Sequence, residues 1–249
     1  MPRHALTLIT LLVATLLTGC ASQRALEEAQ HDPAKLYQLG REALDGGHYE
    51  TAISHFEKLS SLFPFGEYAQ QAQLDTAYAY YRNNEPDSAI AAAEQFIKTY
   101  PRHPDLDYAY YLRGLANFGQ TSDSLDKLLR SDPAERDPRS ALDSFRYFAE
   151  LIRRFPDSRY AGDAMQRMVH LKNYLARHEL YVADHYMRRG AYVAAASRAR
   201  YVIENYPRTA SVPQALEILA QAYDRLGLDE LAAATRRVQS ANTGSAPKG

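Results

Sequence analysis

The chain has 249 residues, with 29 lysines and arginines against 30 aspartates and glutamates, a formal net charge of −1 at pH 7. This balance argues against a nucleic-acid partner, because proteins that bind nucleic acid carry a strongly basic surface. A single cysteine excludes any disulfide within the chain, and the abundance of alanine, leucine, glutamate and arginine favours helices over strands. The composition therefore predicts an all-α protein.

The N-terminus combines a short apolar run with the only cysteine. The run from Ala5 to Leu17 follows Arg3 and has 13 residues, whereas a helix needs about 20 apolar residues to cross a bilayer. Residues 1–19 are therefore predicted to be a cleaved signal peptide rather than a membrane span. Leu17-Thr18-Gly19-Cys20 resembles a bacterial lipobox, which implies acylation of Cys20 and, with Ala21 next, sorting to the outer membrane.

Residues 20–32 are predicted to form a lipid-anchored linker ahead of the first helix. A flexible segment of 12 residues spans roughly 20 Å, so the first helices would stay near the membrane. The alternative is an ordinary secreted protein in which the Gly-Cys pair occurs by chance.

Four prolines that follow aromatic residues indicate an internal repeat. The pairs are Phe63-Pro64, Tyr100-Pro101, Phe155-Pro156 and Tyr206-Pro207. Each proline is expected to end a helix, because it cannot continue the hydrogen-bond ladder. In the first unit, small Gly40 and Ala52 let two antiparallel helices approach, and Tyr49, Phe56 and Leu59 fill the space around them. These residues resemble the tetratricopeptide (TPR) repeat, a helix-turn-helix unit of about 34 residues.

The remaining chain carries further copies, which predicts a TPR superhelix of about five repeats. Residues 33–156 form an N-terminal half with repeats 1–3, and an insertion near residues 119–138 is either a binding loop or a tolerated surface loop. Residues 157–239 form a C-terminal half with repeats 4–5, in which the first helix is predicted to start far upstream. Residues 240–249 lack an apolar period and are expected to be disordered.

No group of residues assembles into a catalytic or metal site. His178 and His185 are seven residues apart, but no acidic residue stands at metal-ligand spacing, so a surface pair is expected. Four carboxylates fall at positions that a TPR exposes and are interpreted as solvated: Glu42, Glu50, Glu57 and Asp75. The sequence also lacks a phosphate-binding glycine loop and a nucleophile elbow. It therefore predicts no enzyme, no cofactor and no metal.

A stack of TPR hairpins presents a concave groove lined by the first helix of each repeat. The repeat positions assign eight residues to this groove: Tyr37, Arg41, Leu74, Tyr78, Tyr81, Arg82, Tyr108 and Tyr111. Tyrosines and arginines can stack on aromatic side chains, accept an extended peptide and hold a terminal carboxylate. The alternative is that several of these tyrosines pack between neighbouring repeats with their hydroxyls in water.

The region from Tyr160 to Pro207 carries a more specific resemblance. It contains Val169-His170-Leu171-Lys172-Asn173-Tyr174-Leu175-Ala176, then Arg189-Gly190-Ala191-Tyr192-Val193-Ala194, and ends at Tyr206-Pro207. Together with the lipobox, the five repeats and the inserted third unit, this string resembles the BamD family, the lipoprotein subunits of the bacterial β-barrel assembly machinery. The resemblance covers nearly all of the mature chain.

This resemblance implies a non-enzymatic scaffold that is lipid-anchored on the periplasmic face of the outer membrane. The N-terminal repeats would receive unfolded outer-membrane proteins through a C-terminal signal ending in an aromatic residue. The C-terminal repeats would dock the periplasmic domains of BamA, and the other Bam lipoproteins would contact the surface. Arg198 matches a basic position at the docking end, although the neighbouring Ala195-Ala196 departs from the family pattern.

Arg188 and Arg189, at the nearby turn, are further docking candidates. For all three arginines the alternative is a solvated turn without a partner. A rival function shares the anchor and the repeats: a periplasmic TPR lipoprotein that serves as an adaptor for peptidoglycan or cell-division enzymes.

Overall fold

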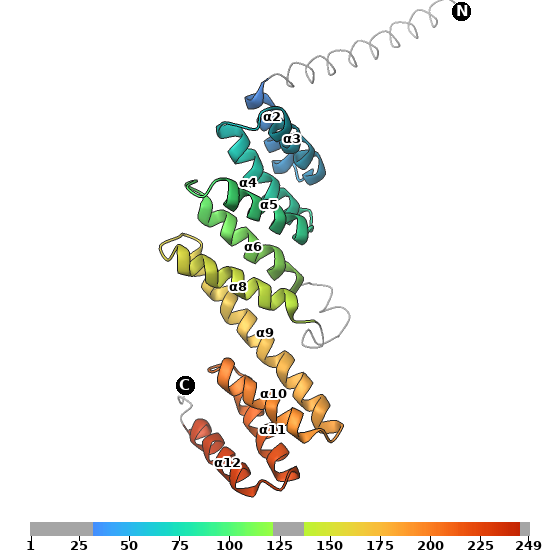
Figure 1. Ribbon diagram of the computed structural model, residues 1–249, viewed down its shortest axis with the longest axis vertical. Coiled ribbons are helices and arrows are strands. Elements are labelled where there is room, and N and C mark those ends of the chain that lie inside the picture. The colour runs from blue at the N-terminus through green and yellow to red at the C-terminus, as the bar shows by residue number, and fades with distance from the viewer. Residues whose placement is uncertain (1–31, 122–136, 245–249) are drawn as a thin grey trace, which may run out of the picture. The chain divides into compact units, whose positions relative to one another are not determined.

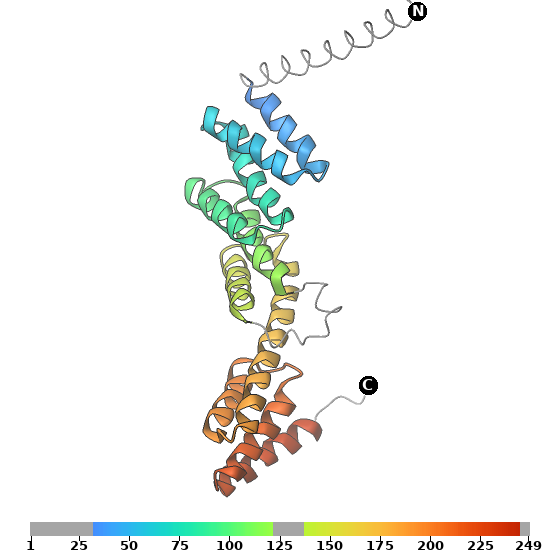
Figure 2. The same ribbon diagram turned by 90° about the vertical axis from the view of Figure 1, so that its right-hand side faces the viewer.

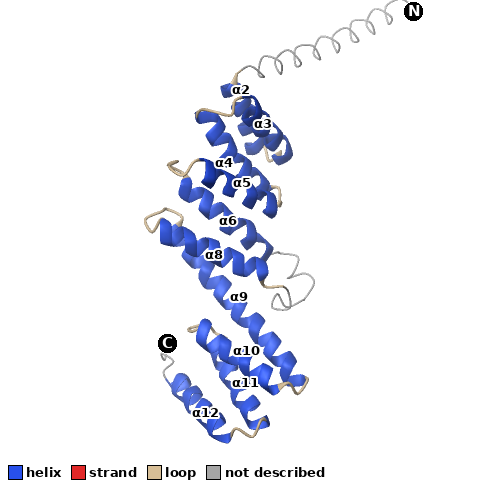
Figure 3. Ribbon diagram, viewed as in Figure 1, coloured by secondary structure: helices blue, strands red, loops and turns tan. Residues whose placement is uncertain are grey.

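The computed structural model describes residues 32–121 and 137–244, and the regular elements in these ranges are all helices (Figure 3). In chain order they are α2 (Pro33–Asp45), α3 (Tyr49–Leu62), α4 (Glu67–Arg82), α5 (Pro86–Thr99), α6 (Leu106–Thr121), α8 (Arg139–Arg154), α9 (Ala161–Arg188), α10 (Tyr192–Asn205), α11 (Val212–Arg225) and α12 (Asp229–Gly244) (Figure 1). The predicted all-α fold is confirmed. The predicted signal peptide, Cys20 and most of the insertion lie outside the described residues.

The described residues up to Leu112 form one compact unit. Within it, α2 and α3 form an antiparallel hairpin, α4 and α5 form the next, and α4 also packs against α2 and α3 (Figure 2). Gly40 of α2 lies against the fully buried ring of Phe56 in α3, and a Cβ at Gly40 would be 2.3 Å from Phe56 Cε1. A side chain at Gly40 would therefore hold the two helices apart, as the repeat pattern predicts.

The described residues from Arg113 onward form the second compact unit. It repeats the same contact, because a Cβ at Gly114 in α6 would be 2.3 Å from Phe148 Cε1 in α8. The buried Ser144 hydroxyl donates to the Gly114 carbonyl oxygen at 2.9 Å and joins the two helices further. Farther along, α9 packs against α8, α10 and α11, and α12 packs against α11.

Turns and helix ends follow the signals in the sequence. The turns inside four hairpins each contain a residue with positive φ: Gly47, Asn84, Gly190 and Gly227. Glycine adopts this conformation without strain, and asparagine tolerates it better than most residues. The predicted aromatic residues cap α3, α5, α8 and α10, and each of their N–H groups donates to the carbonyl four residues earlier. Proline follows each cap, so the helix cannot continue.

Two boundaries differ from those predicted. The chain divides into its two compact units between Leu112 and Arg113, whereas the sequence-based division falls after residue 156. The reason is α9, a single helix of 28 residues that packs against α8 as well as α10 and so holds the third repeat with the fourth. At the C-terminus, α12 continues to Gly244, and residues 240–244 are helical where the sequence predicts disorder. Ser240 contributes there by donating its hydroxyl to the Arg237 carbonyl oxygen at 2.9 Å.

Candidate peptide-binding groove

A buried carboxylate joins α2 and α4 in the first unit. Asp75 is only 6% exposed, and its Oδ2 accepts a hydrogen bond from Tyr37 Oη at 2.8 Å. Gln71 Nε2 donates to Asp75 Oδ1 at 3.3 Å, and Arg41 Nη1 lies 3.6 Å from Oδ2. The interpretation of Asp75 as a solvated carboxylate was therefore wrong, because α2 covers the face of α4 that carries it.

Burial controls the titration of this cluster. Loss of water raises the pKa of Asp75, and the Tyr37 hydrogen bond and the Arg41 charge lower it again only in part. Burial also raises the pKa of Tyr37, and the neighbouring Asp75 carboxylate raises it further. The Tyr37 hydroxyl consequently stays protonated as a donor, and Tyr37 and Asp75 fix each other's orientation across the two helices.

Two turns beyond Asp75 along α4, Arg82 lies between two tyrosines. Its Nη1 donates to Tyr78 Oη at 2.7 Å and its Nη2 donates to Tyr49 Oη at 2.5 Å. The guanidinium carbon also stands 5.1 Å from the centroid of the Tyr49 ring and 5.6 Å from that of Tyr78. Two neutral hydroxyls orient Arg82 but do not neutralise it, so this exposed cation can still bind an anion.

The other predicted groove residues divide into two groups. Tyr81 and Tyr108 are half-buried, and the Tyr81 ring lies 6.3 Å from that of Tyr78. Leu74 and Tyr111 are buried and do not line an open surface. Leu74 lies in a buried stretch of α4 because α2, α3 and α5 all pack against that helix. We use "tyrosine–arginine surface" for four predicted groove residues on α2 and α4 that are half-buried or exposed: Tyr37, Arg41, Tyr78 and Arg82.

Asp75 and Tyr49 have roles in the structure that were not predicted from the sequence. Gln71, Asp75, Tyr78 and Arg82 follow the spacing of one face of a helix, and that spacing is a signal by which Asp75 could have been assigned to the groove. Tyr49 was assigned to hairpin packing. It does pack there, and its hydroxyl also accepts from Arg82.

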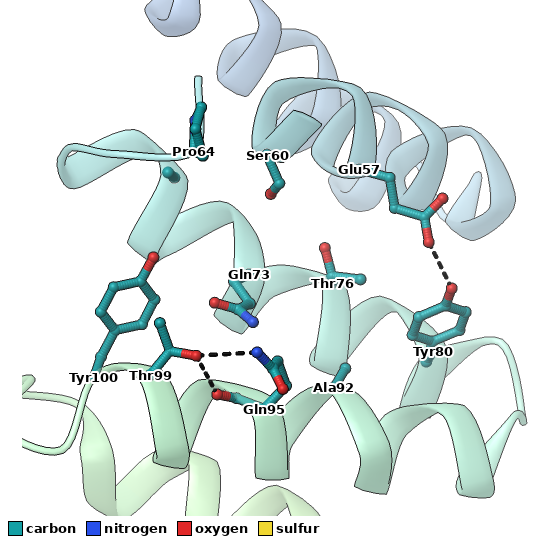
Figure 4. Close-up of a pocket in the computed structure, with 11 residues that line it drawn as sticks. Glu57, Ser60, Pro64, Gln73, Thr76, Tyr80, Ala92, Gln95, Thr99 and Tyr100 are labelled. Carbon is teal, nitrogen blue, oxygen red and sulfur yellow. Dashed lines mark hydrogen bonds between the residues drawn. The ribbon is translucent and has the colours of Figure 1, made fainter. Parts of the chain in front are cut away.

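A separate pocket of about 430 Å³ lies among α3, α4 and α5 (Figure 4). Eleven residues line it: Glu57, Ser60, Pro64, Ala69, Gln73, Thr76, Tyr80, Ala92, Gln95, Thr99 and Tyr100. Tyr80 Oη donates to Glu57 Oε1 at 2.8 Å at one end, and burial together with Glu57 raises the pKa of Tyr80 to about 12. The lining contains no cation, so this pocket suits an uncharged group rather than a carboxylate.

The predicted docking arginines lie around the turn between α9 and α10. Arg188 and Arg189 are exposed at the end of α9. Arg198, on α10, donates from Nη1 to Glu179 Oε2 of α9 at 3.0 Å. On the same helix Val193 and Tyr201 are exposed. The hairpin of α9 and α10 therefore carries both exposed cations and exposed apolar side chains.

Residues 32–121 and 137–244 contain no group of three or more His, Cys, Asp or Glu side chains placed to hold a metal ion. His178 is half-buried and His185 is exposed. None of the helices in these ranges combines the length and the apolar character needed to cross a membrane.

Comparison with known proteins gives extensive matches. The family model described as "YfiO: Outer membrane lipoprotein" matches residues 29–238. Proteins named "Outer membrane protein assembly factor BamD" are similar over nearly their whole length. The relative from Neisseria meningitidis serogroup A is 43% identical (96% of this chain and 92% of the relative), that from Vibrio cholerae 38% (95% and 98%), and that from Haemophilus influenzae 34% (96% and 91%).

Among solved structures, the crystal structure of MamA protein aligns at 18% identity with a TM-score of 0.32, over 82% of this chain and 88% of that one. The family model covers residues 29–238, and the relative from Neisseria meningitidis serogroup A aligns with 96% of the chain. The chain belongs to the BamD family of outer membrane lipoproteins.

Proposed function

We propose that this protein is a non-enzymatic scaffold of the β-barrel assembly machinery, which holds other chains in place at the outer membrane. The observation that carries the proposal is the similarity to outer membrane protein assembly factors over 96% of the chain. The helical hairpins support it, because stacked hairpins offer extended surfaces to partner chains. The described residues offer two such surfaces, one in each compact unit.

The attachment to the membrane is the first part of this proposal. Residues 1–19 act as a signal peptide, acylated Cys20 holds the protein at the periplasmic face of the outer membrane, and residues 20–32 link it to α2. A lipid attached to Cys20, the only cysteine of the chain, supplies the anchor. The acyl chains contribute about 0.8 kcal/mol per buried CH₂, and more than one chain is needed for stable anchoring.

The N-terminal unit receives unfolded outer-membrane proteins at the tyrosine–arginine surface. A C-terminal aromatic residue of the substrate stacks against Tyr78 and its neighbours, and the terminal carboxylate pairs with Arg82. Arg82 is better suited to this role than Arg41, because Arg41 already lies near two carboxylates, Asp45 at 3.1 Å and Asp75 at 3.6 Å.

The C-terminal unit docks the periplasmic domains of BamA and contacts the other Bam lipoproteins. Arg188 and Arg189 are exposed at the end of α9. Arg198 keeps 46% of its side chain accessible while it pairs with Glu179. Arginine and exposed apolar side chains are enriched in protein interfaces, which supports this assignment.

Affinity purification from solubilised membranes tests the scaffold role. Full-length tagged protein is expected to recover BamA in stoichiometric amount. Recovery of peptidoglycan hydrolases, synthases or cell-division proteins without BamA would overturn the proposal in favour of the rival adaptor function. A strain with an untagged chain controls for adsorption to the resin.

The groove assignment predicts a specific loss when Arg82→Ala is introduced. For a peptide ending in phenylalanine with a free carboxylate, the affinity should fall roughly tenfold, because an exposed charged hydrogen bond contributes at the lower end of about 1.5–3 kcal/mol. The same peptide with a C-terminal amide should bind both proteins alike. Fluorescence titration of a labelled peptide measures the four affinities.

Two variants sharpen this comparison. Tyr78→Phe keeps the ring but removes the hydroxyl that accepts from Arg82, so it should weaken only the carboxylate peptide, and by less than Arg82→Ala. Tyr78→Ala should weaken both peptides, because it removes the stacking surface. Equal affinities of wild type and Arg82→Ala for the carboxylate peptide, with helicity retained by circular dichroism, would remove the groove assignment.

A further inference from the structure

Three exposed apolar side chains surround the turn between α3 and α4. Leu62 is 49% exposed, Phe65 is 90% exposed and Tyr68 is 43% exposed. The only charged side chain between residues 62 and 68 is that of Glu67. Gly66, next to Phe65, has φ of 106°, a conformation that favours glycine. The turn therefore presents a large ring almost entirely to solvent, which is costly without a partner.

This turn lies at the end of the first hairpin where the chain enters α2. Because α2 and α3 run antiparallel, the last turn of α3 is beside the first turns of α2 (Figure 2). The Tyr68 ring, in the first turn of α4, stands 5.6 Å from the ring of Tyr37 in α2. The opposite end of the hairpin, at His48, is about 20 Å away, given 13 residues in α2 at about 1.5 Å each.

We propose that Leu62, Phe65 and Tyr68 form a membrane-contacting surface that enters the headgroup region of the bilayer. The inference rests on the proposed anchor at Cys20, since only 12 residues separate that cysteine from Pro33. Twelve residues span at most about 3.6 Å each even when fully extended, so the turn is held within reach of the lipid surface. Aromatic side chains partition to the membrane interface, where a ring meets both apolar and polar surroundings.

The shape of the surface favours lipid over a protein partner. Phe65 is 90% exposed on a turn, and the 430 Å³ pocket is lined by the neighbouring Pro64 and Ala69 but not by Leu62, Phe65 or Tyr68. The protruding ring of Phe65 can insert into the headgroup region of a bilayer, which needs no complementary pocket. With the acyl anchor as one point of attachment, this surface supplies a second, and the two together fix how the first hairpin stands on the membrane.

The chain offers a clean test, because it contains no tryptophan and only one cysteine. Phe65→Trp places the sole tryptophan at the turn, and His48→Trp is the matched control at the exposed opposite end of the hairpin. The mature chain is coupled through Cys20 to maleimide-headgroup lipid in phosphatidylethanolamine–phosphatidylglycerol vesicles. This chemical tether replaces the acyl anchor. The experiment therefore measures whether the turn between α3 and α4 contacts lipid even if the cell does not acylate Cys20.

The expected result is a blue shift of the Phe65→Trp emission and loss of most of its intensity when the vesicles contain brominated lipid. The His48→Trp emission should keep its position and intensity. Equal quenching at both positions, or none at Phe65→Trp, would overturn the inference. So would an emission shift caused by an unfolded outer-membrane protein in solution while the vesicles cause none. Circular dichroism verifies folding, and Leu62→Trp reads the same surface if Phe65→Trp does not fold.

Discussion

Gly40→Ala is expected to lower the free energy of unfolding by about 2 kcal/mol. The added Cβ would lie 2.3 Å from Phe56 Cε1, and two further atoms of the same ring lie within 3 Å. The Phe56 ring is fully buried and cannot swing away. Overpacking of this kind costs up to about 3 kcal/mol, and the better helix propensity of alanine returns about 1 kcal/mol. Urea unfolding followed by circular dichroism measures the difference.

Two further variants test whether contact with the Phe56 ring causes the loss of stability in Gly40→Ala. Gly162→Ala adds the same methyl group in α9, where a Cβ would meet nothing within 4 Å, so its stability should stay equal or rise slightly. In the background of Phe56→Leu, the penalty of Gly40→Ala should shrink because the smaller side chain leaves room. If Gly40→Ala is as stable as wild type, or if Phe56→Leu leaves its penalty unchanged, the packing explanation fails.

Cys20→Ser is expected to remove nearly all of the protein from the outer-membrane fraction while leaving it folded. A hydroxyl cannot take the place of the thiol in lipid attachment, and Cys20 is the only thiol of the chain. Fractionation after a high-salt wash, followed by immunoblotting, measures the loss, and radiolabelled palmitate reports acylation directly. Ser22→Ala, two residues on, keeps the thiol and should localise as wild type. A normal amount of Cys20→Ser in the washed outer membrane would refute the anchor.

The helix ends were predictable because their signals are local. Phe63, Tyr100, Phe155 and Tyr206 cap helices as predicted, since the proline that follows each one forbids continuation whatever surrounds it. The contact between Gly40 and Phe56 was predictable for a related reason. The repeat pattern pairs a small residue with a large one, and two helices joined by a short turn have few ways to pack.

The burial of the groove residues was harder to predict, because it depends on elements distant in sequence. Leu74 and Asp75 stand at positions that an isolated repeat would expose, yet α2, α3 and α5 pack around α4. Tyr37, which lies 38 residues earlier, supplies the hydrogen bond that makes the burial of Asp75 tolerable. The placement of Tyr78 and Arg82 on one face of α4 needed only helical spacing, and in the structure Tyr78 is half-buried and Arg82 is exposed.

The continuity of α9 has a geometric consequence for the second compact unit. Its 28 residues span about 42 Å, with α8 packed along it before α10. Because α9 is unbroken, it fixes the direction in which α10 faces relative to α8. One extra residue in the middle of α9 would rotate α10 by about 100°, whereas four would leave a rotation of about 40° and add about 6 Å. The length of α9 therefore sets the relative orientation of the helices packed on it. Only insertions close to a whole number of turns would preserve the orientation of α10 relative to α8.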